Sequence, residues 1–262
     1  MGKYFNITVK PEIEVAALAG GNITDAQILF DWHGFDIPKG AAKLIGITIL
    51  YTGKNGVDYT PTDFELFWAK GNNDGTAPGT LGGDAGVVDT FGWFPNIQGK
   101  TYVDASVGKN DGDLIMGNVI AVPYIHGGSG AAAFVNNAGH AGTSQGVVLQ
   151  GIPDSGTNVG YDKIYVSAIA KDTHNWGAST MTVDGTMSTS SPVLTVADLS
   201  PILSGIGPGD VLRDEDNLLF GTVKSVDSAT QITMEDNLAA TSTNDKIVYN
   251  TCPITLVLSF ER

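Results

Sequence analysis

The chain has 262 residues, with 28 acidic and 14 basic side chains, so its formal net charge is −14. This charge argues against a nucleic-acid partner and against an anionic membrane surface, because both are bound through clustered lysine and arginine. With 42% hydrophobic and 16% charged residues, the composition is that of a globular protein. The one cysteine, Cys252, excludes an intramolecular disulfide and a cysteine-based zinc site, since each needs at least two cysteines.

Targeting signals are not evident in the sequence. Residues 1–6 lack the apolar core and the small-residue cleavage site of a signal peptide. No apolar run approaches the ~20 residues that a membrane helix needs. We therefore expect a protein that is made and assembled in the cytoplasm, as one large domain or two smaller ones.

Short segments rich in β-branched and aromatic residues, each bounded by Gly, Asn, Asp or Pro, predict β-strands. In chain order they are residues 5–9, 44–51, 64–68, 102–107, 114–125, 163–170 and 254–260. Only residues 11–20 and 24–32 have a helix-compatible composition, the second with Thr24 as a candidate N-cap. Neither carries a long apolar stripe with a 3.6-residue period, so the sequence predicts an all-β protein.

A change of composition after Val183 marks a second unit. Residues 184–192 have linker character, and five short predicted strands follow within some sixty residues, a pattern that fits a small β-barrel. These strands are residues 193–196, 211–212, 220–226, 232–234 and 246–249. A unit of this size is close to the lower limit for independent stability, so we expect the larger domain to brace it.

The last predicted strand, residues 254–260, is placed back in the first domain. A terminal apolar strand stays ordered only when it is tied into a sheet, and the opening strand, residues 5–9, also needs a partner. We therefore expect a large domain of residues 1–184 plus 252–262, with a small barrel-like domain of residues 185–251 inserted in it.

Two long segments rich in Gly, Asn and Asp, residues 71–86 and 127–160, separate the strands. Loops longer than ~15 residues are usually functional or ordered by a partner. The stretch 127–146 has few bulky apolar residues and cannot bury enough area to become rigid in isolation. These segments are the expected contact surfaces, and a neighbouring subunit could order the second.

The aromatic residues offer two interpretations. The four tryptophans could form a sugar-binding platform, but we prefer the alternative that Trp68 is a core residue on a strand and that Trp93 anchors a loop. Phe91, Trp93 and Phe94 are crowded beside a glycine and a proline, a composition typical of an apolar interface. The candidate interface residues are Phe91, Trp93, Phe94, His126, Asn136, Asn137 and His140.

Ser144 lies in a G-x-S-x-G pattern, and His126 precedes two glycines as in the oxyanion loop of a lipase. Asp154 or Asp162, followed by His174, would complete the order Ser, acid, His. A nucleophile elbow needs a strand before its serine and a helix after it, whereas here a Gly/Asn/Ala loop precedes the serine and a short strand follows. We therefore expect no catalytic triad and no enzyme.

Histidines and acidic clusters could bind a metal ion, but hydrogen bonding and turn chemistry explain them more simply. The histidines show no i, i+4 pair and sit beside glycine or polar turns, so hydrogen bonding in loops or interfaces is preferred over a zinc site. They are His33, His126, His140 and His174. Acidic clusters at residues 111–113 and 214–217 could hold calcium but lack the ligand spacing of a 12-residue calcium loop, and turn chemistry explains them. We expect no metal and no cofactor.

Three segments, residues 42–48, 63–68 and 163–168, resemble virion structural proteins of tailed phages, those of marine phages most closely. Residues 209–212 and 221–233 are similar to small barrel modules of phage head and tail proteins. The resemblance covers most of the chain as a pattern of strands and turns. It implies a jelly-roll-like antiparallel β-sandwich that serves as a capsid decoration protein, a head fibre or a tail part, and it brings no catalytic residues.

From these observations we expect a non-enzymatic capsid decoration or cement protein on the exterior of the virion. Its partners would be the major capsid protein or other virion proteins, and a homotrimer would suit local three-fold positions of the shell. The alternatives are a tail or head-fibre component, a carbohydrate-binding module with exposed aromatic side chains, and a hydrolase centred on Ser144.

Overall fold

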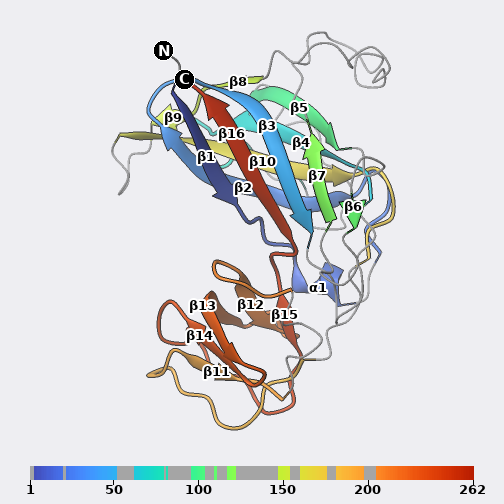
Figure 1. Cartoon of the computed structure of the whole chain (residues 1–262), viewed down its shortest axis with the longest axis vertical. Helices are drawn as coiled ribbons and strands as arrows, with labels where there is room; N and C mark the ends of the chain where they lie inside the picture. The colour runs from blue at the N-terminus through green and yellow to red at the C-terminus, as the bar shows by residue number, and fades with distance from the viewer. Residues whose placement is uncertain are drawn as a thin grey trace.

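The structure, a computed structural model, describes residues 3–19, 22–51, 62–79, 81, 96–103, 109–110, 117–121, 147–153, 160–175, 181–197 and 205–262. These residues form antiparallel strands arranged in three sheets, together with one short helix, α1 (Val15–Leu18) (Figure 1). The predicted all-β class is confirmed.

The strands of each sheet come from distant parts of the chain. The first sheet has the order β1 (Tyr4–Val9), β16 (Ile254–Glu261), β3 (Ala42–Tyr51), β7 (Gly117–Ala121) and β6 (Lys109–Asn110), and β8 (Val147–Leu149) also pairs with β3. The second has the order β2 (Ile28–Pro38), β10 (Tyr161–Ala170), β4 (Phe64–Lys70) and β5 (Ile97–Val103), and β9 (Ile152–Pro153) pairs with β10. The third has the order β11 (Val193–Thr195), β14 (Gln231–Met234), β13 (Leu219–Ser228), β12 (Val211–Asp214) and β15 (Val248–Asn250).

The first two sheets pack face to face around the main hydrophobic core (Figure 1). Ile47 and Phe260 enter this core from the first sheet, and Trp68 enters it from the second. Tyr51 and Phe64 meet edge to face between the sheets, with ring centroids 6.2 Å apart. Burial of each such side chain contributes about 1.5–3 kcal/mol, so the predicted antiparallel β-sandwich is held mainly by this layer.

The C-terminal strand β16 lies between β1 and β3. Ile7 is opposite Leu258 on one side of the strand, and Leu258 is opposite Ile47 on the other. Both edges of β16 are therefore paired, and the first and last strands of the chain lie side by side. The prediction that the first and last strands lie close together is confirmed.

The third sheet has a hydrophobic cluster of its own, in which Leu212, Phe220 and Ile232 are buried. All five predicted strands of this unit are present. The strand pairings run from β11 to β15. Residues 182 and 183 lie between the two ends of this order, because Val183 bridges Val196 directly after β11 and Thr182 bridges Ile247 directly before β15. Met181 and Val183 belong to its cluster although they precede the expected boundary. The division into two domains stays a prediction.

Ion pairs and backbone hydrogen bonds join the third sheet to the segment between β1 and α1. Lys10 lies 2.5 Å from Asp210, and Arg213 lies 3.1 Å from Glu12. The Ile13 N–H donates to the carbonyl of residue 251 at 2.7 Å. Burial raises the pKa of Asp210, although hydrogen bonds from Lys10 and neighbouring groups oppose this shift.

The observed elements differ from the expected ones at both helix-compatible segments and at the start of one strand. No helix forms over residues 24–32: the Thr24 hydroxyl donates to the Gln27 side chain in a turn, and β2 begins at Ile28. In residues 11–20 the helix is only α1, four residues long. The strand expected at residues 102–107 begins earlier, at Ile97, and the described part of the strand expected at 114–125 is β7.

Candidate interaction surface

The candidate contact residues from the sequence lie outside the residues that the structure describes. They are Phe91, Trp93, Phe94, His126, Asn136, Asn137 and His140. Ser144 also lies outside the described residues. Trp68 is fully buried, and its indole N–H donates to the Thr101 hydroxyl at 3.0 Å. The prediction that Trp68 is a core residue is confirmed.

Two residues considered for a catalytic triad, Asp162 and His174, are engaged within the fold. The Asp162 carboxylate accepts a hydrogen bond from the Gly40 N–H at 2.8 Å. His174 has one ring nitrogen 2.8 Å from the Thr62 hydroxyl and the other 3.1 Å from the Asp63 carbonyl. Burial lowers the pKa of His174 to about 4, so its ring is neutral at pH 7. A neutral ring that donates to the carbonyl can accept from the hydroxyl, and both nitrogens are then satisfied.

The outer side of the first sheet is open and nearly free of charge. Opposite residues in antiparallel strands point to the same face, so the pairings define this side, which we call the open face. It consists of Tyr4, Asn6, Thr8, Val257, Ser259, Glu261, Lys43, Gly46, Thr48, Leu50 and Val148, with the buried Thr255 at its end. Lys43 and Glu261 are its only charged residues among the described side chains, in a chain whose net charge is −14.

Exposed large apolar side chains lie at two opposite ends of the open face. Tyr4 is 69% exposed and Val148 is 56% exposed, the two highest values for large apolar residues in the described part of the chain. They belong to one row across the sheet, in the order Tyr4, Glu261, Lys43, Val148. The Tyr4 hydroxyl donates to the Glu261 carboxylate at 3.2 Å. This row places apolar groups on either side of a charged pair.

The outer side of the second sheet is covered by the protein itself. Leu81 packs there on Ile28 and Phe67, and all three are buried. Lys100 is only 1% exposed, pairs with Glu65, and lies 6.0 Å from the centre of the Phe67 ring. A buried pair of this kind costs about 3–5 kcal/mol to break by removing one partner. The two sides of the sandwich therefore differ: in the part of the chain that the structure describes, the outer side of the first sheet is the more exposed one.

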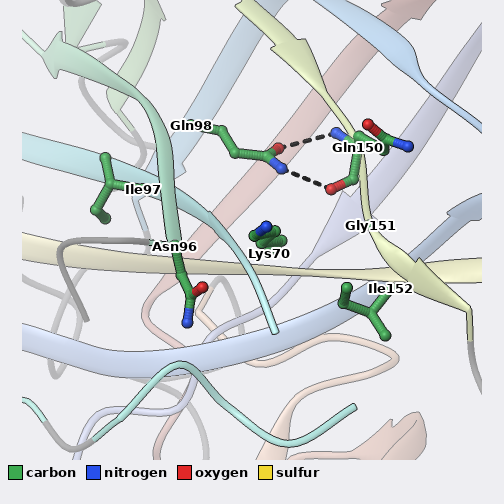
Figure 2. A pocket seen from close by; sticks show the side chains of 7 residues that line it. All are labelled: Lys70, Asn96, Ile97, Gln98, Gln150, Gly151 and Ile152. Atoms are coloured by element: carbon green, nitrogen blue, oxygen red, sulfur yellow. Dashed lines mark hydrogen bonds between the residues drawn. The ribbon is translucent and has the colours of Figure 1, made fainter. Parts of the chain in front are cut away.

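A polar pocket lies at one edge of the second sheet (Figure 2). Its volume is about 330 Å³ and its walls come from the end of β4, from the start of β5 and from the segment between β8 and β9. The lining residues are Lys70, Asn96, Ile97, Gln98, Gln150, Gly151 and Ile152. One ammonium group and three side-chain amides give the pocket donors and acceptors for a polar group.

The Gln98 side chain ties two segments together beside this pocket. Its amide accepts a hydrogen bond from the Gln150 N–H at 2.8 Å and donates to the Gln150 carbonyl at 2.6 Å, as Figure 2 shows. At Gly99 a Cβ atom would lie 2.4 Å from the Val147 side chain, so only glycine permits this approach of β5 and β8. Asn96 and Val147 directly follow the segments that hold the candidate interface residues. The described residues that follow these two segments therefore lie close together.

The described residues contain no group of three or more His, Cys, Asp or Glu side chains that could hold a metal ion. In the cluster at 214–217, the Asp214 carboxylate accepts hydrogen bonds from the N–H groups of Asp216 and Leu218, at 3.0 and 2.9 Å, which is turn chemistry. Cys252 is buried, and burial raises the pKa of its thiol to about 12. No helix in the described ranges has the length and hydrophobicity needed to cross a membrane.

The fold and the open face define an antiparallel β-sandwich protein with an additional small sheet. Comparison with known proteins adds no relative: no family model, no curated protein and no solved structure matches the chain. Sequence reasoning missed the open face, although the alternation of Tyr, Asn, Thr, Val and Ser with buried residues in β1 and β16 carries the signal for it.

Proposed function

We propose that the chain is a non-enzymatic structural protein of a tailed-phage virion, a decoration protein that binds the outside of the capsid lattice through its open face. The observation that carries this proposal is the open face itself. A sheet surface with two charged residues costs little to desolvate, whereas the rest of an acidic chain resists close contact with other proteins. The resemblance of the strand segments to phage virion proteins supports the same conclusion.

The mechanism is mass action. A protein that binds the assembled lattice, and not its separated subunits, stabilises the lattice by its binding free energy. The β-sandwich suits this task, because its contact surface is built on paired strands and is fixed before binding. The third sheet is joined to the sandwich by the Lys10–Asp210 pair, extends the molecule in one direction and is not part of the open face (Figure 1).

The proposal is tested by placing a charge in the open face. Thr48 is half-buried at the centre of this face, between Val257 on β16 and residue 120 on β7. We expect Thr48→Lys to reduce binding to capsids that lack the protein by at least tenfold, because the ammonium group must lose water on docking. The measurement is co-sedimentation of purified chain with such capsids.

The matched control is Thr222→Lys, the same change at a half-buried strand position of the third sheet. It should bind like the original chain. Equal binding by both variants would reject the open face as the contact. Detection of the chain only in tail fractions of the virion would reject decoration and favour the tail or fibre alternative.

A further inference from the structure

Strand β1 forms an edge of the first sheet, and one side of it is unpaired in the described structure. Lys3 and Arg262 exchange backbone hydrogen bonds of 3.0 and 2.9 Å. In an antiparallel pair such residues alternate with residues whose backbone groups point away from the partner strand. The N–H and C=O groups of Tyr4, Asn6 and Thr8 therefore point outward from β16. Among the described residues they have no backbone partner.

This edge lacks the features that normally prevent strands of different molecules from pairing. Charged side chains, proline and bulges protect most exposed edges. The edge strand of the second sheet, β2, carries Asp31, Asp36 and Pro38, and its pairing with β10 has register shifts. The six residues of β1 include no charge and no proline, and their pairing with β16 is regular.

We propose that β1 pairs with β1 of a second copy of this chain, antiparallel, about a two-fold axis at Asn6. The three outward residues then form three pairs: Asn6 with Asn6 of the partner subunit, and Tyr4 with Thr8 of the partner subunit, which occurs twice. Each pair exchanges two backbone hydrogen bonds, so six form in all. The axis relates Asn6 to Asn6 of the partner subunit, so one outward residue lies on each side of it along the strand.

The side chains of β1 are complementary to themselves in this register. On the open-face side, Asn6 meets an identical amide that both donates and accepts, and Tyr4 meets a threonine. On the core side, Phe5 is opposite Ile7 of the partner subunit. Phe5 and Ile7 are half-buried and already pack on the main core, so pairing would complete their burial.

Charge favours a second copy as the occupant of this edge. In the paired strands, the one charged residue is Lys3, and it lies opposite Val9 of the partner subunit. No two charged residues therefore repel each other across the contact. The result is one continuous sheet across two molecules. A two-fold contact of this kind closes a dimer, which differs from the trimer expected from the sequence.

The test is oxidative cross-linking of the full-length chain. In the proposed register the two copies of residue 6 have Cα atoms about 5.5 Å apart, within the ~4.4–6.8 Å range of a disulfide. The matched control is Ser259→Cys: Ser259 is opposite Asn6 on β16, so its two copies would be separated by three strand spacings, roughly 14 Å. The native Cys252 is buried and should remain unreacted.

We expect sedimentation velocity of the original chain to show a dimer, and mild oxidation to convert most of Asn6→Cys, but little of Ser259→Cys, to a covalent dimer. A monomer or a trimer at tens of micromolar, or equal cross-linking of the two variants, would overturn the proposal. A chain that is monomeric when free but protected at β1 on capsids would show that a strand of another protein occupies this edge. Sedimentation and cross-linking use the free chain without capsids, so their results are independent of the proposed function.

Discussion

His174 shows how a polar residue is accommodated inside this sandwich. Its ring lies against Phe64, with centroids 6.0 Å apart, and both ring nitrogens have partners on the segment at residues 62–63. Protonation would place a charge in this buried site, and burial, only partly opposed by Asp63 and Asp172, is the main cause of the lowered pKa of His174. The sequence interpretation of loop hydrogen bonding agrees with these contacts.

This site predicts acid sensitivity. Between the ordinary pKa of 6.5 and the folded value of about 4, the unfolded chain binds a proton that the folded chain does not. The contribution of His174 to the free energy of unfolding is therefore full above about pH 6.5, falls as the pH drops, and is reduced by about 3 kcal/mol near pH 4. Urea unfolding between pH 4 and 8 measures it.

The comparison uses His174→Gln, which keeps hydrogen-bonding capacity but does not titrate. The variant should show a weaker dependence of stability on pH than the original chain. A residual slope of the same sign should remain, since burial also lowers the pKa of His33. Parallel curves for the two proteins would contradict the assignment.

At the scale of elements, the third sheet should be removable without unfolding the sandwich. Its cluster begins at Met181, so the deletion should span residues 181–250 and be bridged by a Gly/Ser linker. We expect a β-protein that melts cooperatively but is less stable. The deletion removes the buried Tyr249 from the main core, which lowers the free energy of unfolding by about 1.5–3 kcal/mol. Circular dichroism during heating provides the measurement.

The contrasting deletion removes residues 254–262. It takes away β16, which pairs with both β1 and β3, so it should abolish cooperative melting. If the first deletion failed to melt cooperatively, the third sheet would be an integral part of the sandwich and not an insertion.

At the scale of the whole molecule, the proposed decoration role predicts a defect in particle stability. Particles that lack the chain should still form heads but should lose packaged genome at lower temperature, while adsorption to host cells stays unchanged. The physical reason is linkage: a lattice-binding protein at 100 times its Kd adds about 2.7 kcal/mol per site. Heating particles with and without the chain, followed by a nuclease assay of released DNA, tests this. Unchanged heat tolerance with defective adsorption would favour a fibre.

The sequence by itself determined the all-β class, most strand positions, the buried place of Trp68 and the closeness of the first and last strands. These features follow from local alternation and from the need of a terminal apolar strand for partners, both of which are visible along the chain. Composition also indicated the five strands of the third sheet, although the hydrophobic cluster of this sheet includes Met181 and Val183, which precede the expected boundary.

The tertiary structure alone decided the remaining features. Strand β2 was missed because Ile28, Leu29 and Phe30 are all buried: Ile28 lies under Leu81 on one side, and the other two enter the main core, so no alternation remains to be seen. In the same way, Lys100 is buried and Thr8 is exposed because one side of the sandwich is covered by a distant segment and the other is not. Which surface stays exposed depends on contacts between residues that are far apart in the chain. The alternation of apolar and polar residues along one strand does not show these contacts.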